Sequence, residues 1–356
     1  MDIDLPYKLV PVAELPGHED RAWHVAWNPK KPTLASCSAD KTVRLYSYSS
    51  APCSHSTNLD DANTSSHAHE HPLRFEHIST IPTGHAKTVR SVAWAPSGET
   101  LATASFDSNI GIWEKGEEEP DEDGATGDGE WECISTLEGH ETECKSVAYS
   151  STGTLLASCS RDKTVWIWEA HPDGEFETIS VLMEHTQDVN QILASASYDD
   201  TIKLYIEDPS DDWFCFTTLS GHASTVWSLA WSPAGTGGYL ASASDDKTVR
   251  IWRRVAEHKW DWSKGKQAES PHALGWLASA GGDGNVLIWE LSEPASEDES
   301  PTAVRPPTHK LIANLKSAHG VHDVNSVVWC PRKGFEDLLA TTGDDGYTRI
   351  WKIVPS

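Results

Sequence analysis

An internal repeat is the feature that most constrains how this chain can fold. Segments such as LASCSRDKTVWIW, in which two short apolar runs flank a polar turn with an aspartate, occur seven times along the 356 residues. The second run alternates as V-x-I/L-W/Y, the pattern of a strand with one buried face, and the polar turn is typical of a β-hairpin. A regular series of such hairpins predicts an all-β chain of seven similar units. The seven copies end at Tyr46, Trp113, Trp168, Tyr205, Trp252, Trp289 and Trp351.

Two further strands complete each unit. Most hairpins follow a histidine and an apolar run that ends in an aromatic residue such as Trp27 or Trp94, and segments such as WECISTL at 131–137 lie between copies. Units of four strands and about 40 to 45 residues resemble the WD40 repeat, so we expect one seven-bladed WD40 β-propeller over residues 7–356. No fourth strand follows the last copy, which predicts that the N-terminal YKLVPVAEL segment supplies the outer strand of blade seven.

Most blades pair a histidine with the aspartate of the hairpin turn. In the first three blades the two residues are 22 positions apart. We expect a structural network of histidine, turn aspartate, strand serine and tryptophan or tyrosine, each buried hydrogen bond contributing roughly 0.5 to 1.5 kcal/mol. A catalytic His-Asp pair is the alternative, but repetition of the same pair from blade to blade argues against it. The predicted network residues are His18 and Asp40, His85 and Asp107, His140 and Asp162, His222 and Asp246, and His319 and Asp345.

Blades four and six are predicted to be truncated. Sixteen residues lead from His140 to Leu156 in blade three, whereas only eight lead from His185 to Leu193 in blade four. The polar segment at 253–275 in blade six contains neither a Gly-His pair nor the V-x-x-x-A-W pattern of an innermost strand. Both blades therefore lack the residues of an innermost strand. We interpret the gaps as a gene-model or splicing artefact in preference to a functional variant.

Three insertions are rich in serine, proline, glycine and acidic residues, a composition that cannot bury a core. We expect a disordered insertion at 49–74, an acidic loop at 115–130 and a Ser/Pro/acid-rich loop at 292–308. The first contains HAHEH at 67–71, whose alternating histidines are a candidate metal motif. Because its neighbours are asparagine, threonine and serine, with no anchored ligand, we predict no specific metal site there.

Charge and motif content narrow the function. A net charge of -26 opposes direct binding of nucleic acid and of anionic membranes. The seven cysteines form no CxxC and are expected to be thiols, and no G-x-x-x-x-G-K-[ST], HExxH or GxSxG motif occurs. We therefore predict no catalytic residues, no resident metal and no cofactor. Asp2 and Asp4 stand where a signal peptide carries positive charge, so we expect a cytoplasmic protein that also enters the nucleus.

Several stretches go beyond a generic WD40 pattern. RAWHVAWNP, STLEGHETECKSVAYS, EHTQDVNQILASASYDDTIKLY and DDWFCFTTLSGHASTVWSLAWSP resemble the WD40 subunit of the cytosolic iron-sulfur protein assembly machinery. The resemblance implies a non-catalytic scaffold of the complex that delivers clusters to cytosolic and nuclear apoproteins. Its implied partners are the other targeting subunits, namely a small acidic-pocket factor and a large helical-repeat protein, an iron-hydrogenase-like cluster carrier and client apoproteins. A ubiquitin-ligase substrate receptor, a chromatin adaptor and a metalloenzyme that uses the histidine-rich loop stay open as alternatives.

The residue before each turn aspartate predicts a partner-binding surface. This position lies at a hairpin tip on one rim of the propeller, and blades two to four place Phe106, Arg161 and Tyr198 there. Tyrosine and arginine are enriched in interface hot spots. We expect Arg161 to lie between the two aromatic rings and to pair with a partner carboxylate. The full series is Ala39, Phe106, Arg161, Tyr198, Asp245, Gly282 and Asp344.

Overall fold

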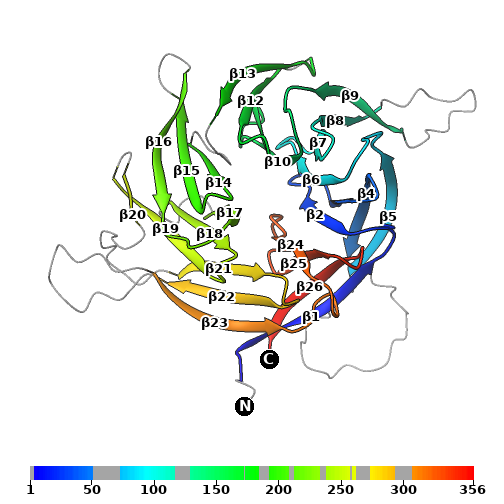
Figure 1. The fold of residues 1–356 in the computed structure, drawn as a ribbon. Helices are drawn as coiled ribbons and strands as arrows, with labels where there is room; N and C mark the ends of the chain where they lie inside the picture. Colours follow the sequence, from blue (N-terminus) through cyan, green and yellow to red (C-terminus); the bar gives the residue numbers. More distant parts are fainter. Residues whose placement is uncertain are drawn as a thin grey trace, which may run out of the picture.

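The computed structural model describes residues 4–50, 73–116, 129–171, 173–183, 192–207, 212–232, 238–256, 259–261, 273–292 and 307–356. Across these residues the chain forms 26 strands and no helix, so no described helix could span a membrane. The strands make seven antiparallel sheets, which are arranged as blades around a central axis (Figure 1). The predicted all-β, seven-bladed propeller is confirmed.

Five blades have four described strands each, and in four of these blades the strands pair in chain order from the axis outward. They are β2 (Ala22–Trp27), β3 (Thr33–Ser38), β4 (Thr42–Ser50) and β5 (Leu73–Pro82) in blade one; β6 (Val89–Trp94), β7 (Leu101–Ser105), β8 (Ile110–Lys115) and β9 (Trp131–Leu137) in blade two; β10 (Cys144–Tyr149), β11 (Leu155–Ser160), β12 (Val165–Ala170) and β13 (Phe176–Leu182) in blade three; and β17 (Val226–Trp231), β18 (Tyr239–Ser244), β19 (Val249–Ala256) and β20 (Lys259–Asp261) in blade five.

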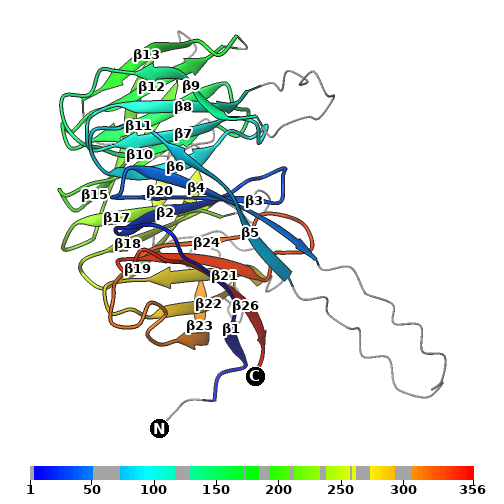
Figure 2. The same cartoon turned by 90° about the vertical axis from the view of Figure 1, so that its right-hand side faces the viewer.

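Blade seven joins the two ends of the chain. It contains β24 (Val324–Trp329), β25 (Leu338–Gly343), β26 (Thr348–Pro355) and, as its outer strand, β1 (Tyr7–Leu15). Leu9 of β1 pairs with Ile353 of β26, and Figures 1 and 2 show these two strands side by side. The N-terminal segment therefore closes the ring as its sequence predicts, and it covers what would otherwise be an open sheet edge.

Blades four and six have three described strands each, and the segments on which the predicted truncation depends, 184–191 and 262–272, lie outside the described residues. Blade four consists of β14 (Ile192–Ala196), β15 (Thr201–Glu207) and β16 (Trp213–Ser220), and blade six of β21 (Ala273–Ala280), β22 (Val286–Ser292) and β23 (Thr308–Leu315). In both blades the strand nearest the axis, among the described residues, corresponds to the second strand of a complete blade.

The predicted insertions fall largely outside the described residues, which leave out 51–72, 117–128 and 293–306. The boundaries set from composition are too wide in blade one. Ser50 still pairs with Leu73, and Ser49 with Arg74, because β4 and β5 continue as a paired ribbon beyond the apolar part of the blade. The HAHEH segment lies outside the described residues.

The hydrophobic core lies between neighbouring blades. Val43 and Leu45 of β4 pack in one cluster with Trp94 of β6 and Leu101 of β7, all of them buried. Alternation along each strand places such residues on the faces that the blades turn toward each other. Full burial of one such side chain contributes about 1.5 to 3 kcal/mol, so each blade is stabilised mainly by the two blades beside it.

A β-bulge recurs in the outer strands. Opposite the Leu45-Tyr46 step of blade one the register skips Ile78, and at the equivalent places it skips Ile134 in blade two and Ile179 in blade three. A bulge interrupts the row of free hydrogen-bonding groups at a sheet edge and increases its twist. The repeated bulge therefore disfavours edge-to-edge association of the blades of different molecules.

His24 connects the inner strands of blades one and two. Its Nδ1 lies 3.0 Å from the carbonyl oxygen of Val92 on β6. Burial, together with the nearby guanidinium of Arg90, lowers the pKa of His24 to about 4, although the hydrogen bond to Val92 opposes this shift. The folded protein therefore holds a neutral imidazole at pH values where an unfolded chain holds a charged one.

This difference predicts a loss of stability in mild acid. As the pH falls below about 6.5, His24 becomes protonated in the unfolded state, whereas in the folded state it is protonated only near pH 4. Between pH 8 and pH 5 the free energy of unfolding should fall by about 2 kcal/mol more in the wild type than in His24→Gln. Urea titrations of both proteins at the two pH values measure this difference, and equal pH dependence in the two would contradict the assignment.

Candidate functional site

The structure brings every predicted histidine-aspartate pair together. In blade three His140 Nδ1 lies 2.9 Å from Asp162, and its Nε2 lies 2.9 Å from Ser158 Oγ. Trp168 Nε1 donates to the same Ser158 oxygen at 2.9 Å. The corresponding distances from His Nδ1 to the Asp carboxylate are 2.9 Å for His18 and Asp40, 3.0 Å for His85 and Asp107, 2.8 Å for His222 and Asp246, and 2.8 Å for His319 and Asp345.

The protonation of the pair follows from its surroundings. Burial would raise the pKa of Asp162, but hydrogen bonds from Thr164 and His140 outweigh it and lower the pKa below the usual value. Burial lowers the pKa of His140, in spite of the nearby carboxylate. An ionised carboxylate only accepts hydrogen bonds, so Nδ1 carries the proton of a neutral imidazole and Nε2 accepts from Ser158. Both ring nitrogens are thus engaged within the blade.

This engagement disfavours a catalytic role for the histidines. The His140 side chain has 0% exposure, and the same arrangement recurs in blades one, two, five and seven. A general base must reach a proton of the substrate, directly or through one water. The pairs instead connect the loop before each inner strand to the hairpin turn of the same blade.

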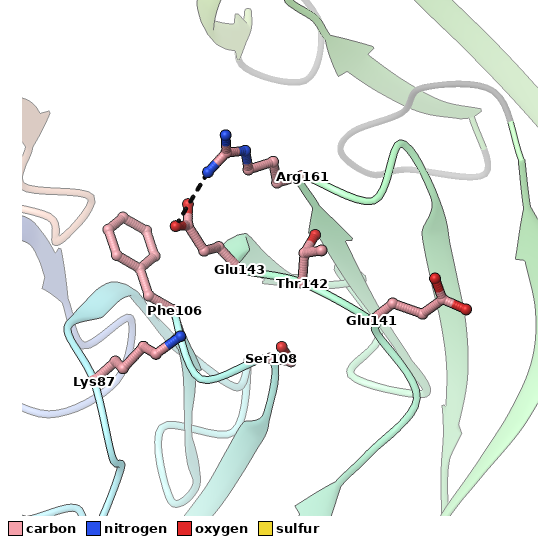
Figure 3. A pocket seen from close by; sticks show the side chains of 7 residues that line it. All are labelled: Lys87, Phe106, Ser108, Glu141, Thr142, Glu143 and Arg161. Atoms are coloured by element: carbon pink, nitrogen blue, oxygen red, sulfur yellow. Dashed lines mark hydrogen bonds and ion pairs between the residues drawn. The ribbon is translucent and has the colours of Figure 1, made fainter.

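The three predicted tip residues lie on the rim but not in one cluster. Phe106 and Arg161 line a cavity of about 250 Å³ between blades two and three, together with Lys87, Glu141 and Glu143 (Figure 3). The remaining lining residues are Ser108 and Thr142.

Tyr198 belongs to a different contact. It is 66% exposed, and its ring packs edge-on against Trp227 of blade five with centroids 5.1 Å apart. Trp227 is itself 52% exposed. The rim therefore presents a mixed-charge cavity on blades two and three and an aromatic pair on blades four and five.

The prediction that Arg161 lies between two aromatic rings is wrong. Arg161 Nη1 instead pairs with Glu143 Oε1 at 3.4 Å, as Figure 3 shows. The cation over the Phe106 ring is Lys145, whose Nζ lies 4.0 Å from the ring centroid. The blades diverge from the axis, so consecutive tip residues are separated by the start of the next inner strand, and Glu143 and Lys145 fill that space.

Glu143, Lys145 and Trp227 were not predicted as site residues from the sequence. A usable signal exists for Glu143, because the backbone N-H of Arg161 donates to its carbonyl oxygen at 3.0 Å across 18 residues. Phe106 makes the same bond to Thr88, also 18 residues earlier. In blades one to three, pairing each tip residue with the residue 18 positions before it predicts the neighbour of the tip.

Metal binding finds no support in the described part of the chain. There, no group of three or more histidine, cysteine, aspartate or glutamate side chains is placed to hold an ion. Burial raises the pKa of Cys37 to about 12 and also raises that of Cys144 far above its usual value, so both remain protonated thiols that serve as packing residues.

Comparison with known proteins first defines the class. The WD domain, G-beta repeat family matches residues 9–47, 75–114, 131–169, 176–205, 213–253 and 310–352. The crystal structure of the WD40 beta propeller domain of Doa1 superposes with a TM-score of 0.60 at 21% identity, covering 97% of each chain, which supports the fold. The chain is a WD40 β-propeller protein.

Comparison with relatives then defines the family. A protein of Mycosarcoma maydis is 44% identical over 97% of this chain and 93% of its own length. One of Cryptococcus neoformans var. neoformans serotype D (strain JEC21 / ATCC MYA-565) is 39% identical over 98% and 99%. Both are named "Probable cytosolic iron-sulfur protein assembly protein 1". The chain belongs to this family of cytosolic iron-sulfur protein assembly proteins.

The relatives are also longer in places. The alignment with the Cryptococcus protein runs over 452 positions, more than the 356 residues of this chain. The relative therefore has segments without a counterpart in this chain.

Proposed function

We propose that this chain is a non-catalytic scaffold of cytosolic iron-sulfur protein assembly, which binds the other targeting subunits, the iron-hydrogenase-like cluster carrier and client apoproteins. The observation that carries the proposal is the near full-length similarity to assembly proteins of the same propeller class. The name of these relatives places them in the cytosol, and we propose the cytoplasm and the nucleus as the locations of this chain.

Two features of the molecule support a scaffold over an enzyme. The histidine-aspartate pairs, which are the groups best suited to acid-base chemistry, are used up in a hydrogen-bond network that five blades share. The rim meanwhile offers exposed aromatic and cationic side chains, which are the residue types that dominate protein interfaces. We propose that Phe106, Arg161 and Tyr198 contribute to partner binding as two neighbouring contact areas.

Affinity purification tests the function. The tagged chain, expressed in a fungal host, should recover iron-sulfur targeting subunits and the cluster carrier, identified by mass spectrometry. Recovery of cullin adaptors or histone-modifying subunits in their place would establish a ubiquitin-ligase receptor or a chromatin adaptor and overturn the proposal. A propeller of the same class from a different pathway serves as the control for nonspecific capture.

A scaffold also differs from a cluster carrier in its own absorbance. Ligation of a cluster takes about four thiolates that converge on one site, whereas Cys37, Cys144 and Cys330 are each buried in different places of the ring. Protein purified without oxygen should therefore contain far less than one iron per chain and show no band in the 400 nm region. Absorbance equivalent to one cluster per chain, together with matching iron and sulfide analysis, would contradict this prediction.

A further inference from the structure

A second cavity lies in blade two, beside the histidine-aspartate pair. Its volume is about 100 Å³, and its lining includes His85, Asp107, Asn109, Gly111 and Cys133. Drug-sized ligands occupy pockets of about 300 to 1,000 Å³, so this cavity has room for a single side chain. The hairpin turn separates it from the larger rim cavity, because Phe106 and Ser108 line the larger cavity while Asp107 and Asn109 line this one.

This second cavity is open because Gly111 has no side chain to fill it. At the equivalent position of the third strand, blades one, five and seven have Arg44, Arg250 and Arg349, and blade three has Trp166. These side chains lie across the network of their own blade. Arg44 and Arg250 contact the glycines that precede the network histidines, so that a Cβ on Gly17 or Gly221 would collide with them.

Blades three and seven show the same use of this space. Trp166 covers Gly139, and its ring lies 5.5 Å from the His140 ring. The Arg349 guanidinium donates to the network carboxylate Asp345. In blade two, no described atom beyond the chain neighbours lies within 4 Å of the Cβ position of Gly84.

The carboxylate of blade two also lacks a donor that its counterparts have. In blades one, three and five a threonine hydroxyl donates to the network aspartate, as Thr42 Oγ1 does to Asp40 Oδ1 at 2.7 Å. In blade two the residue is Asn109, and among the described residues Asp107 Oδ1 accepts only from its backbone N-H, at 3.1 Å. Asp107 thus keeps acceptor capacity beside an open space.

We propose that this cavity, the blade-two socket, binds one arginine side chain of a partner protein. The partner's guanidinium would take the place that Arg44, Arg250 and Arg349 have in their own blades, and it would donate to Asp107 as Arg349 does to Asp345. The socket is a binding site separate from the Phe106 and Arg161 cavity, although one partner that covers the blade-two tip reaches both.

Charge and geometry favour arginine among the cationic residues. The chain has a net charge of -26, so its partners are favoured when they present basic surfaces. A guanidinium is planar, stacks on aromatic faces and donates in a fixed fork, and Trp113 forms one wall of the socket. The chain itself uses arginine at this position in three blades, which shows that the space accepts this group.

A small probe tests the socket without any assembly partner. Nα-acetyl-arginine methylamide is titrated into the ¹⁵N-labelled full chain, and the amide signals of Gly84 and Gly111 are followed by NMR. We expect saturable shifts at these two glycines. The citrulline analogue, which has the same shape but no charge, should bind at least about tenfold more weakly because it loses the charge-assisted hydrogen bond.

Two variants and a control locate the site. Gly111→Arg supplies the chain's own guanidinium and should abolish the shifts at Gly84. In Gly111→Arg the new Cβ would lie 2.8 Å from Trp113 Nε1, so the indole must move. The second variant, Asn109→Thr, restores the hydroxyl donor without such a contact. It should weaken binding of the probe at least fivefold at an unchanged melting temperature. Leu287→Arg, the same change in blade six, should leave binding unaltered.

Three results of these titrations would contradict the proposed arginine site. Equal shifts with the arginine and citrulline probes, shifts that do not saturate, or full binding by Asn109→Thr would each overturn the proposal. Because the probe replaces any natural partner, such a failure leaves the scaffold function standing, and failure of the scaffold function leaves the socket testable.

Discussion

Replacement of Asp162 by alanine is expected to lower the free energy of unfolding by about 3 kcal/mol. The carboxylate accepts hydrogen bonds from His140 Nδ1 at 2.9 Å, from the backbone of Glu141 at 3.0 Å, and from the backbone and hydroxyl of Thr164 at 2.8 and 2.6 Å. Hydrogen bonds to a charged group contribute about 1.5 to 3 kcal/mol, and a buried donor left unpaired costs a further 1 to 3 kcal/mol. Partial hydration of the vacated turn limits the total.

Blade six provides the matched control for this substitution. Asp283 occupies the same turn position and is exposed, but its carboxylate accepts only from the half-buried Asn285 among the described residues. Asp283→Ala should therefore lower stability by less than about 1 kcal/mol, as is usual for surface changes. Urea denaturation of both variants measures the contrast. Similar losses in the two proteins would show that the turn aspartate acts locally and that the histidine network adds nothing.

The fold was predictable because the same hairpin pattern recurs in the sequence of each blade. A hairpin such as β11 and β12 needs only local alternation and a turn aspartate to be recognised, and seven copies set the number of blades. Closure by β1 followed from counting strands at the two ends. The partners of the histidines could also be predicted, since the turn aspartate follows the histidine by 22 residues in blades one to three. The pair keeps its geometry where the spacing is 24 residues in blade five and 26 in blade seven.

The sites were harder to predict because they depend on contacts between blades. Arg161 was expected to stack on aromatic rings, whereas it pairs with Glu143, which lies just before β10. The contact between Glu143 and the hairpin tip joins residues that are 18 positions apart. The role of Gly111 could not be predicted from the strand pattern alone. An alternating strand tolerates glycine, so its meaning appears only when the arginines of the other blades are seen to fill the same space.

The charge reversal Arg161→Glu is expected to weaken capture of a targeting subunit or client by roughly 2 kcal/mol or more, about 30-fold. The Arg161 side chain is 68% exposed and makes one long ion pair with Glu143, which leaves most of its donors free for a partner carboxylate. In the variant two glutamates would face each other at the mouth of the 250 Å³ cavity and repel that carboxylate. The lost surface pair should change stability by no more than about 0.5 kcal/mol.

Two controls distinguish a lost contact from a changed surface charge. Lys163→Glu makes the same change two residues away on the same exposed turn, outside the cavity, and should reduce capture much less. Glu143→Gln removes the intramolecular competitor for the guanidinium, so it should maintain or increase capture if Arg161 binds a partner carboxylate. Pull-downs with matched amounts of folded protein, checked by melting temperature, measure all three. If Arg161→Glu retains every partner at wild-type levels, or if Lys163→Glu loses them equally, the cavity between blades two and three is not the interface, and the exposed pair of Tyr198 and Trp227 becomes the surface to test.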